Sequence, residues 1–238
     1  MTRLEMMLMA AAREIRDGDV VFVGMRLPLQ AFALAQRTHA PNAVGLFECG
    51  IVRNAPPVEP IVTMADPPNV RGAQWVGGMT DLMGLLAQGR VDVGLLGGAQ
   101  LDRYGNLNTS YIGGYVAPQT RLPGSGGASD IASLARRTVI LMNHEKRRFV
   151  EEVDYITSPG HGTGAGWREG AGLPRREGSL PFGGTDAVIS TLGVFRFDDD
   201  GEMVLVETFP GVTVEEVRQN TGWELKVSDA LRDWQPPV

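Results

Sequence analysis

Short apolar runs alternate with amphipathic segments along the first 142 residues of the chain. Four apolar runs end at glycine or polar residues, which is typical of strands buried on both faces of a parallel sheet; they span 20–23, 43–47, 91–96 and 138–142. Apolar residues recur at helical spacing elsewhere and predict helices at 2–18, 28–39, 80–88 and 129–134. Strands that alternate with helices pair in parallel through crossover helices. The pattern therefore predicts an α/β fold with a mostly parallel sheet.

The C-terminal part of the chain has a different pattern. Residues 158–184 are rich in glycine and have almost no apolar periodicity, which is typical of a functional flap or an interface element. Apolar segments at 188–197 and 203–206 flank an Asp-Asp-Asp-Gly sequence that predicts a hairpin turn. A capping box at 213–216, like the one at 2–5, predicts a last helix that ends at Gly222. We expect residues 1–238 to form a single domain.

Composition narrows the classes of function. Apolar residues make up 43% of the 238 positions, which is enough for a sizeable core, and the formal charge of −6 argues against non-specific binding to nucleic acid or to anionic lipid. One cysteine and three histidines without ligand spacing give no basis for a disulfide framework or a metal site. No apolar run approaches the ~20 residues of a membrane span, so we expect a soluble, cytoplasmic protein.

Glu48 is the first candidate for chemistry. It ends the second predicted strand in a Glu-Cys-Gly sequence, and α/β proteins bind ligands outside the carboxyl ends of their parallel strands. A partly desolvated carboxylate at such a place is a good nucleophile. The alternative is a structural glutamate that caps a helix or forms an ion pair.

Two glycine-rich clusters are the next candidates. Gly98, in a Gly-Gly-Ala-Gln sequence, would let the backbone approach a ligand, and the Gln100 amide could orient a carbonyl or a carboxylate. Gly126 and Gly127 precede a predicted helix, where free N–H groups bind anions or oxyanions. The alternatives are a strand end with a turn and a packing turn. Neither cluster has the spacing of a P-loop or of a dinucleotide fingerprint.

Together these segments resemble the β-subunit family of class I CoA-transferases, in particular the glutaconate and 3-oxoadipate types. The matching segments are VVFVG at 20–24, ECG at 48–50, LGGAQLD at 96–102, YGN at 104–106, RLPGSGGA at 121–128, HEKRRF at 144–149, YITSPGHG at 155–162 and NTGW at 220–223. They cover nearly the whole chain in the family's order. The resemblance implies the class I CoA-transferase fold.

The resemblance also implies a mechanism. Glu48 would attack an acyl-CoA thioester and then carry CoA as a glutamyl-CoA thioester. Gln100, Gly98, Gly126 and Gly127 would line the thioester and its oxyanion. No tightly bound cofactor is implied, since CoA thioesters are the substrates. The family pairs each β chain with an α chain, so we expect an inactive chain on its own and an α2β2 or larger heteromer.

Arg26 departs from the family pattern. Members commonly have a second glycine after the first strand, in Gly-x-Gly-x-Pro, where this chain has Gly-Met-Arg-Leu-Pro at 24–28. If this loop lies near Glu48, the guanidinium could bind the distal carboxylate of a dicarboxylic substrate. It could also crowd the pocket or point to solvent.

Three hypotheses about function follow from these residues. The first is transfer of CoA between a donor such as succinyl-CoA or acetyl-CoA and a short dicarboxylate of the 3-oxoadipate or glutaconate type, as in aromatic or dicarboxylate catabolism. The sequences at 160–162 and 172–174 favour the 3-oxoadipate type. The second is a CoA-thioester hydrolase of the same fold, because water could attack the acylated glutamate. The third is a non-catalytic structural or regulatory subunit, in which Arg26 records lost activity.

Overall fold

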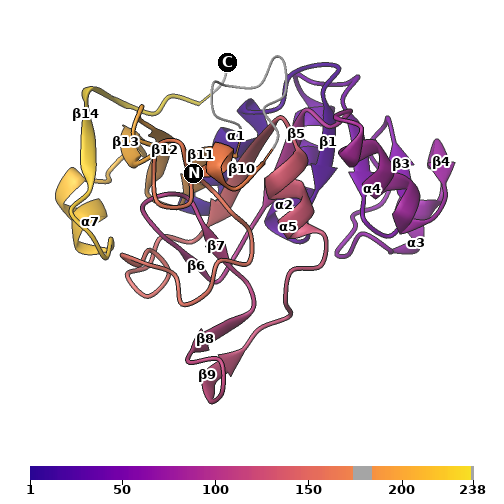
Figure 1. The fold of residues 1–238 in the computed structure, drawn as a ribbon. Coiled ribbons are helices and arrows are strands. Elements are labelled where there is room, and N and C mark those ends of the chain that lie inside the picture. The colour runs from indigo at the N-terminus through magenta and orange to yellow at the C-terminus, as the bar shows by residue number, and fades with distance from the viewer. Residues whose placement is uncertain (174–183, 237–238) are drawn as a thin grey trace.

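A ten-stranded sheet is the centre of the computed structural model, which describes residues 1–173 and 184–236 (Figure 1). Its strands are β1 (Val20–Val23), β2 (Val44–Phe47), β3 (Ile51–Arg53), β4 (Trp75–Val76), β5 (Val93–Leu96), β10 (Arg137–Met142), β11 (Thr185–Ser190), β12 (Gly193–Phe197), β13 (Met203–Thr208) and β14 (Lys226–Asp233). Their order is β14-β13-β12-β11-β10-β5-β1-β2-β3-β4. The five strands from β11 to β2 pair in parallel, and antiparallel pairs extend the sheet on both sides. This confirms the predicted α/β fold.

Helices cover both faces of the sheet. They are α1 (Arg3–Arg13), α2 (Leu27–Arg37), α3 (Pro67–Val70), α4 (Met79–Ala87), α5 (Ala128–Leu134), α6 (Trp167–Gly170) and α7 (Val214–Gln219). A Cβ at Gly45 would lie 2.6 Å from the Phe32 ring of α2, whereas one at Gly94 would lie 2.2 Å from Ile131 of α5. Gly45 is level with Val21 and Gly94 with Phe22, and adjacent strand residues face opposite ways. Therefore α2 and α5 pack on opposite faces.

Two small hairpins stand outside the main sheet. One pairs β6 (Gln100–Leu101) with β7 (Leu107–Asn108), and the other pairs β8 (Tyr111–Gly113) with β9 (Pro118–Arg121). The β8–β9 hairpin projects away from the rest of the chain at the bottom of Figure 1.

Among the described helices, none is both long and apolar enough to cross a membrane.

Two helix predictions need correction. The first helix ends at Arg13 with Glu14 as its C-cap, well before Gly18, because the Asp19 carboxylate accepts the Arg16 N–H in a tight turn. The last helix has only half of its predicted capping box. The Thr213 hydroxyl accepts the Glu216 N–H, but the Glu216 carboxylate accepts two bonds from the Arg3 guanidinium instead of returning to the helix end.

The segment 188–197 is two strands and not one. The Ser190 hydroxyl accepts the Leu192 N–H, which stabilises a turn between β11 and β12. The predicted hairpin that follows is confirmed, with β12 and β13 joined across the Asp-Asp-Asp-Gly turn. The described part of the glycine-rich segment contains one short helix, α6, and residues 174–183 lie outside the described residues.

Candidate active site

The carboxyl ends of β2, β1 and β5 place three of the predicted loops next to one another. The pairing register sets Phe22 level with Leu46 and with Gly94. Two residues further on, Gly24 is level with Glu48, and Gly97 comes directly after the end of β5. The sheet thus brings the Glu48 turn, the Arg26 loop and the Gly98 loop to one edge, where parallel sheets bind ligands.

A tight turn holds Glu48 at this edge. The Gly50 N–H donates to the Phe47 carbonyl at 2.8 Å, and the Gly77 N–H donates to the Gly50 carbonyl at 2.8 Å. Gly50 has φ +98°, and a Cβ there would lie 2.1 Å from the Gly77 carbonyl oxygen. Only glycine fits both constraints. The glycine of the Glu-Cys-Gly sequence is therefore required by the turn that presents the glutamate.

Glu48 meets Gly127, which lies 79 positions later in the chain. Its half-buried carboxylate accepts the Gly127 N–H at 3.0 Å through Oε1. A Cβ at Gly126 would lie 3.3 Å from this oxygen, and one at Gly127 would lie 3.3 Å from the carboxylate carbon. The paired glycines therefore let a helix start approach the carboxylate closely. Among the described residues, no cationic side chain forms an ion pair with Glu48.

Arg26 keeps the backbone conformation of a glycine. As the N-cap of α2 it has φ 63° and ψ −109°, and it is the only non-glycine with positive φ among the described residues. This region favours glycine and costs other residues of the order of 1–3 kcal/mol. The side chain is exposed at the same sheet edge as Glu48. An arginine is thus held in a strained backbone conformation at the sheet edge that also carries Glu48.

Gly98 follows the end of β5, and Gln100 begins β6 of the small hairpin outside the main sheet. The Gly98 carbonyl accepts a long bond of 3.4 Å from Arg148. The Gln100 side chain is buried; its amide nitrogen donates to Asp154 at 3.0 Å and its oxygen accepts from Asn108 at 2.7 Å. The described contacts of Gln100 do not include Glu48. Its contact with a substrate stays a prediction, and it would require one of these bonds to be exchanged.

Residues 102–106 form a turn, as in the structural alternative for this cluster, and the turn also holds a distant loop. The Asn106 oxygen accepts the N–H groups of Gly160 at 2.9 Å and Gly162 at 3.1 Å, and its nitrogen donates to Asp102 at 2.9 Å. Burial raises the pKa of Asp102 to about 6. The turn therefore clamps the loop at 160–162 rather than opening toward the sheet edge.

Neither His144 nor Cys49 has the surroundings of a catalytic base or nucleophile. His144 is stacked on Phe149 at 3.7 Å with Ser190 and Thr221 hydroxyls against its two nitrogens, and burial lowers the pKa of its imidazole to about 3. Desolvation raises the pKa of the Cys49 thiol, which disfavours the thiolate. Within the described ranges no group of three metal-ligating side chains occurs. Glu48 remains the candidate nucleophile at this edge.

Comparison with known proteins identifies the family. Residues 4–220 match the family model described as Coenzyme A transferase. The chain belongs to this family. It is 38% identical over 98% of its length to a subunit of the 3-oxoadipate CoA-transferase of Pseudomonas knackmussii (88% of that subunit), and 38% identical over 97% to a subunit of the glutaconate CoA-transferase of Acidaminococcus fermentans (86% of that subunit).

The fold comparison agrees with the sequence comparison. The crystal structure of glutaconate coenzyme A-transferase from Acidaminococcus fermentans matches with a TM-score of 0.90 and 35% identity, over 100% of this chain and 90% of the other. The resemblance, the fold class and the CoA-transferase activity predicted from the sequence are thus confirmed. CoA thioesters are the substrates of this family.

Proposed function

We propose that Glu48 is the nucleophile of this CoA-transferase. Its carboxylate attacks the carbonyl carbon of an acyl-CoA, the C–S bond breaks, and CoA leaves as a thiolate from a glutamyl–acyl anhydride. The thiolate then attacks the glutamyl carbonyl, the donor acid leaves as a carboxylate, and a glutamyl-CoA thioester remains. The acceptor carboxylate repeats these steps in reverse and leaves as its CoA thioester, which regenerates Glu48.

The Gly127 N–H bond to Glu48 is the observation that supports this proposal. When a thiolate attacks the glutamyl carbonyl, negative charge develops on the carbonyl oxygen. The Gly127 N–H already lies 3.0 Å from one Glu48 oxygen, so a donor is in place for that charge. One donor of this kind contributes about 10²–10³ in rate. Gly126 has no side chain to crowd the same oxygen, whereas a Cβ there would lie only 3.3 Å from it.

The proposed substrates are a short dicarboxylate and an acyl-CoA donor such as succinyl-CoA or acetyl-CoA. The relatives named for 3-oxoadipate and glutaconate support this class, and Arg26 supplies a guanidinium at the sheet edge for a distal carboxylate. Gly98 and Gln100 are proposed to line the CoA side of the pocket. Because each of these relatives is named as one subunit of its enzyme, we propose an α subunit as partner, in an α2β2 or larger assembly.

Trapping the covalent intermediate tests this proposal. The chain is co-expressed with its α subunit and mixed with acyl-CoA, and half of the sample is treated with borohydride, which reduces a glutamyl thioester to an alcohol. We expect CoA on the peptide that contains Glu48 in the untreated half and irreversible loss of activity in the treated half. Continued turnover with an unmodified Glu48 peptide would refute the assignment. CoA release without an acceptor carboxylate, at the rate of transfer, would instead identify a hydrolase.

An Arg26→Gly variant separates backbone strain from substrate contact. We expect the free energy of unfolding to rise by about 1 kcal/mol, because glycine accepts φ 63° and ψ −109° without strain. The larger loss of chain entropy by glycine on folding offsets part of this gain. We also expect KM for a dicarboxylate acceptor to rise about tenfold with the loss of the guanidinium. Urea unfolding and steady-state kinetics measure the two effects.

A monocarboxylate acceptor of the same chain length is the control for Arg26. Its KM should be the same for both proteins, because it has no distal carboxylate to lose. Equal KM values for the dicarboxylate in the two proteins would show that the Arg26 side chain does not contact the substrate, whatever happens to stability.

A further inference from the structure

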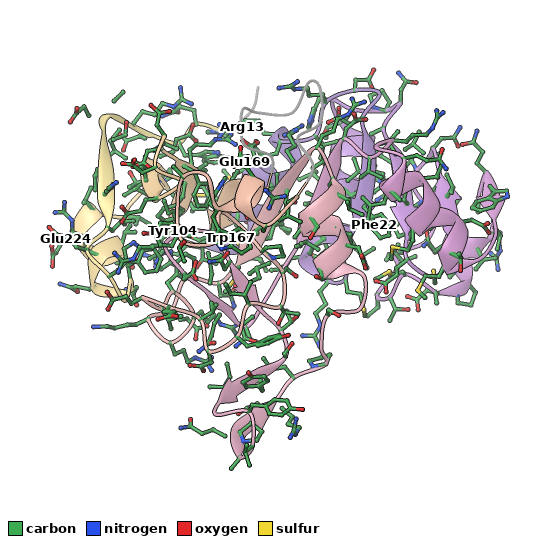
Figure 2. All side chains as sticks on the ribbon, in the orientation of Figure 1. Arg13, Phe22, Tyr104, Trp167, Glu169 and Glu224 are labelled. Carbon is green, nitrogen blue, oxygen red and sulfur yellow. The ribbon has the colours of Figure 1, made fainter. Side chains whose placement is uncertain are left out.

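Arg168 is a buried arginine that binds backbone carbonyls on two different segments. Its side chain belongs to α6, and the residue is 4% exposed. Nη2 donates to the carbonyls of Ala132 and Ser133 at 3.3 Å each, and Nη1 donates to the Gly160 carbonyl at 2.8 Å. The neighbouring α6 side chains, Trp167 and Glu169, are seen near the centre of Figure 2. Arg168 therefore joins the end of α5 to the loop at residue 160.

The other end of α5 binds Glu48. Gly127 is the N-cap of this helix, and its carbonyl accepts the Ile131 N–H at 2.9 Å while its own N–H donates to Glu48. The helix has only seven residues, and a helix this short is marginal without support at its ends. A cation at its C-terminus binds free carbonyls and interacts favourably with the negative end of the helix dipole. The two ends of α5 thus contact Arg168 and the candidate nucleophile.

The loop on the far side of Arg168 is firmly held. The Gly160 N–H donates to Asn106, and a Cβ at Gly160 would lie 2.4 Å from the Gly105 backbone, so the two segments are in close contact. By contrast, two described contacts of α5 with the sheet and with α4 are apolar: Ile131 lies over Gly94, and the Met83 methyl group lies beside Gly127. Apolar contacts limit how closely the helix packs but are not directional. The hydrogen bonds of Arg168 to the Ala132 and Ser133 carbonyls are directional and act at the C-terminal end of α5.

We infer that Arg168 is a positioning residue for the transfer reaction: by holding the C-terminal carbonyls of α5 against the 160 loop, it keeps the Gly127 N–H in line with Glu48. This inference rests on the proposed role of Glu48. The planar guanidinium is needed, because its fork of N–H donors reaches carbonyls on both segments at once. A lysine keeps the positive charge but lacks the planar pair of N–H donors that binds both segments.

The test compares Arg168→Lys with Arg137→Lys in the assembled transferase. Arg137 is a matched control, because its half-buried guanidinium also binds the C-cap carbonyl of a helix, that of Glu14 at 2.6 Å. Arg137 starts β10, so it lies at the amino edge of the sheet, opposite to Glu48. The readouts are kcat, KM for acyl-CoA, and the single-turnover rate at which CoA appears on the Glu48 peptide.

We expect Arg168→Lys to lower kcat and the rate of adduct formation together, by about 10- to 100-fold, with KM within about threefold of wild type. Arg137→Lys should keep both rates within about threefold. Gel filtration confirms assembly, and Arg168→Gln, which keeps a planar donor without the charge, is measured in the same way if the lysine variant does not assemble.

Two results would overturn the inference. One is a wild-type rate of adduct formation in the assembled Arg168 variant, and the other is an equal loss in the Arg137 control. Both comparisons require that the wild-type protein forms a CoA adduct on the Glu48 peptide. Absence of that adduct in active wild-type protein would refute the proposed nucleophile instead, so the two failures are distinguishable.

Discussion

A Glu48→Gln variant of the assembled transferase is expected to lose at least about 1,000-fold in kcat while it still binds acyl-CoA. Glutamine has nearly the same shape, and its amide oxygen can still accept the Gly127 N–H that lies 3.0 Å from Oε1 in the wild type. The amide oxygen is a poor nucleophile, however, and its acylated form does not lead to a glutamyl thioester. Binding of acyl-CoA should therefore persist while CoA transfer stops. Initial rates of CoA transfer and equilibrium binding of acyl-CoA measure the two properties.

Cys49→Ser is the matched control for the Glu48 variant. Cys49 is exposed on the same turn, and its thiol donates only a weak bond of 3.4 Å to the Met64 carbonyl. A hydroxyl can make the same bond, so we expect transfer rates within about threefold of wild type. Substantial turnover by Glu48→Gln would contradict the nucleophile assignment. A loss as large in Cys49→Ser would indicate that the turn itself had been disturbed.

The regular part of the fold could be predicted from the sequence because its signals are local. The strands β1, β2, β5 and β10 are continuous apolar runs, and burial on both faces of a parallel sheet requires such runs. The strands from β6 to β9 have two to four residues each, which is too short for any alternation to be visible. β14 is largely polar and none of its residues is buried, so no apolar run marks it as the strand that pairs with β13.

The candidate site was predictable where position at a strand end was enough. Glu48 follows a clear buried strand, but its bond to Gly127 joins residues 79 positions apart, and no periodic pattern shows such a contact. For Gln100, the sequence predicted a position near the edge but could not predict the direction of its amide, which bonds to Asp154 and Asn108. No sequence pattern indicated a role for Arg168. It binds backbone carbonyls, which every residue has, so its partners could not be recognised from side-chain types.

Gly50→Ala is expected to lower the free energy of unfolding by roughly 3–5 kcal/mol and to reduce transfer activity in whatever protein still folds. Two costs add at this position. The φ of +98° is unfavourable for alanine, and the new Cβ would lie 2.1 Å from the Gly77 carbonyl oxygen, which is backbone and cannot rotate away. Relief requires the Glu48 turn to separate from the 77–78 segment. Urea unfolding and transfer kinetics measure the two consequences.

Gly18→Ala separates the two costs, because Gly18 has a similar φ of +84° but a Cβ there would meet nothing within 4 Å. This control should cost only about 1–2 kcal/mol, from the left-handed backbone alone, with unchanged transfer activity. Equal destabilisation by the two variants would mean that the Gly77 contact contributes nothing. The excess cost of Gly50→Ala, in turn, measures how firmly the neighbouring backbone holds the turn that presents Glu48. Since Glu48 lies only two residues before Gly50, the rigidity of this turn also limits how far the carboxylate can move from the Gly127 N–H. Stability and transfer activity should therefore fall together in Gly50→Ala. In Glu48→Gln the activity should fall while the stability is kept.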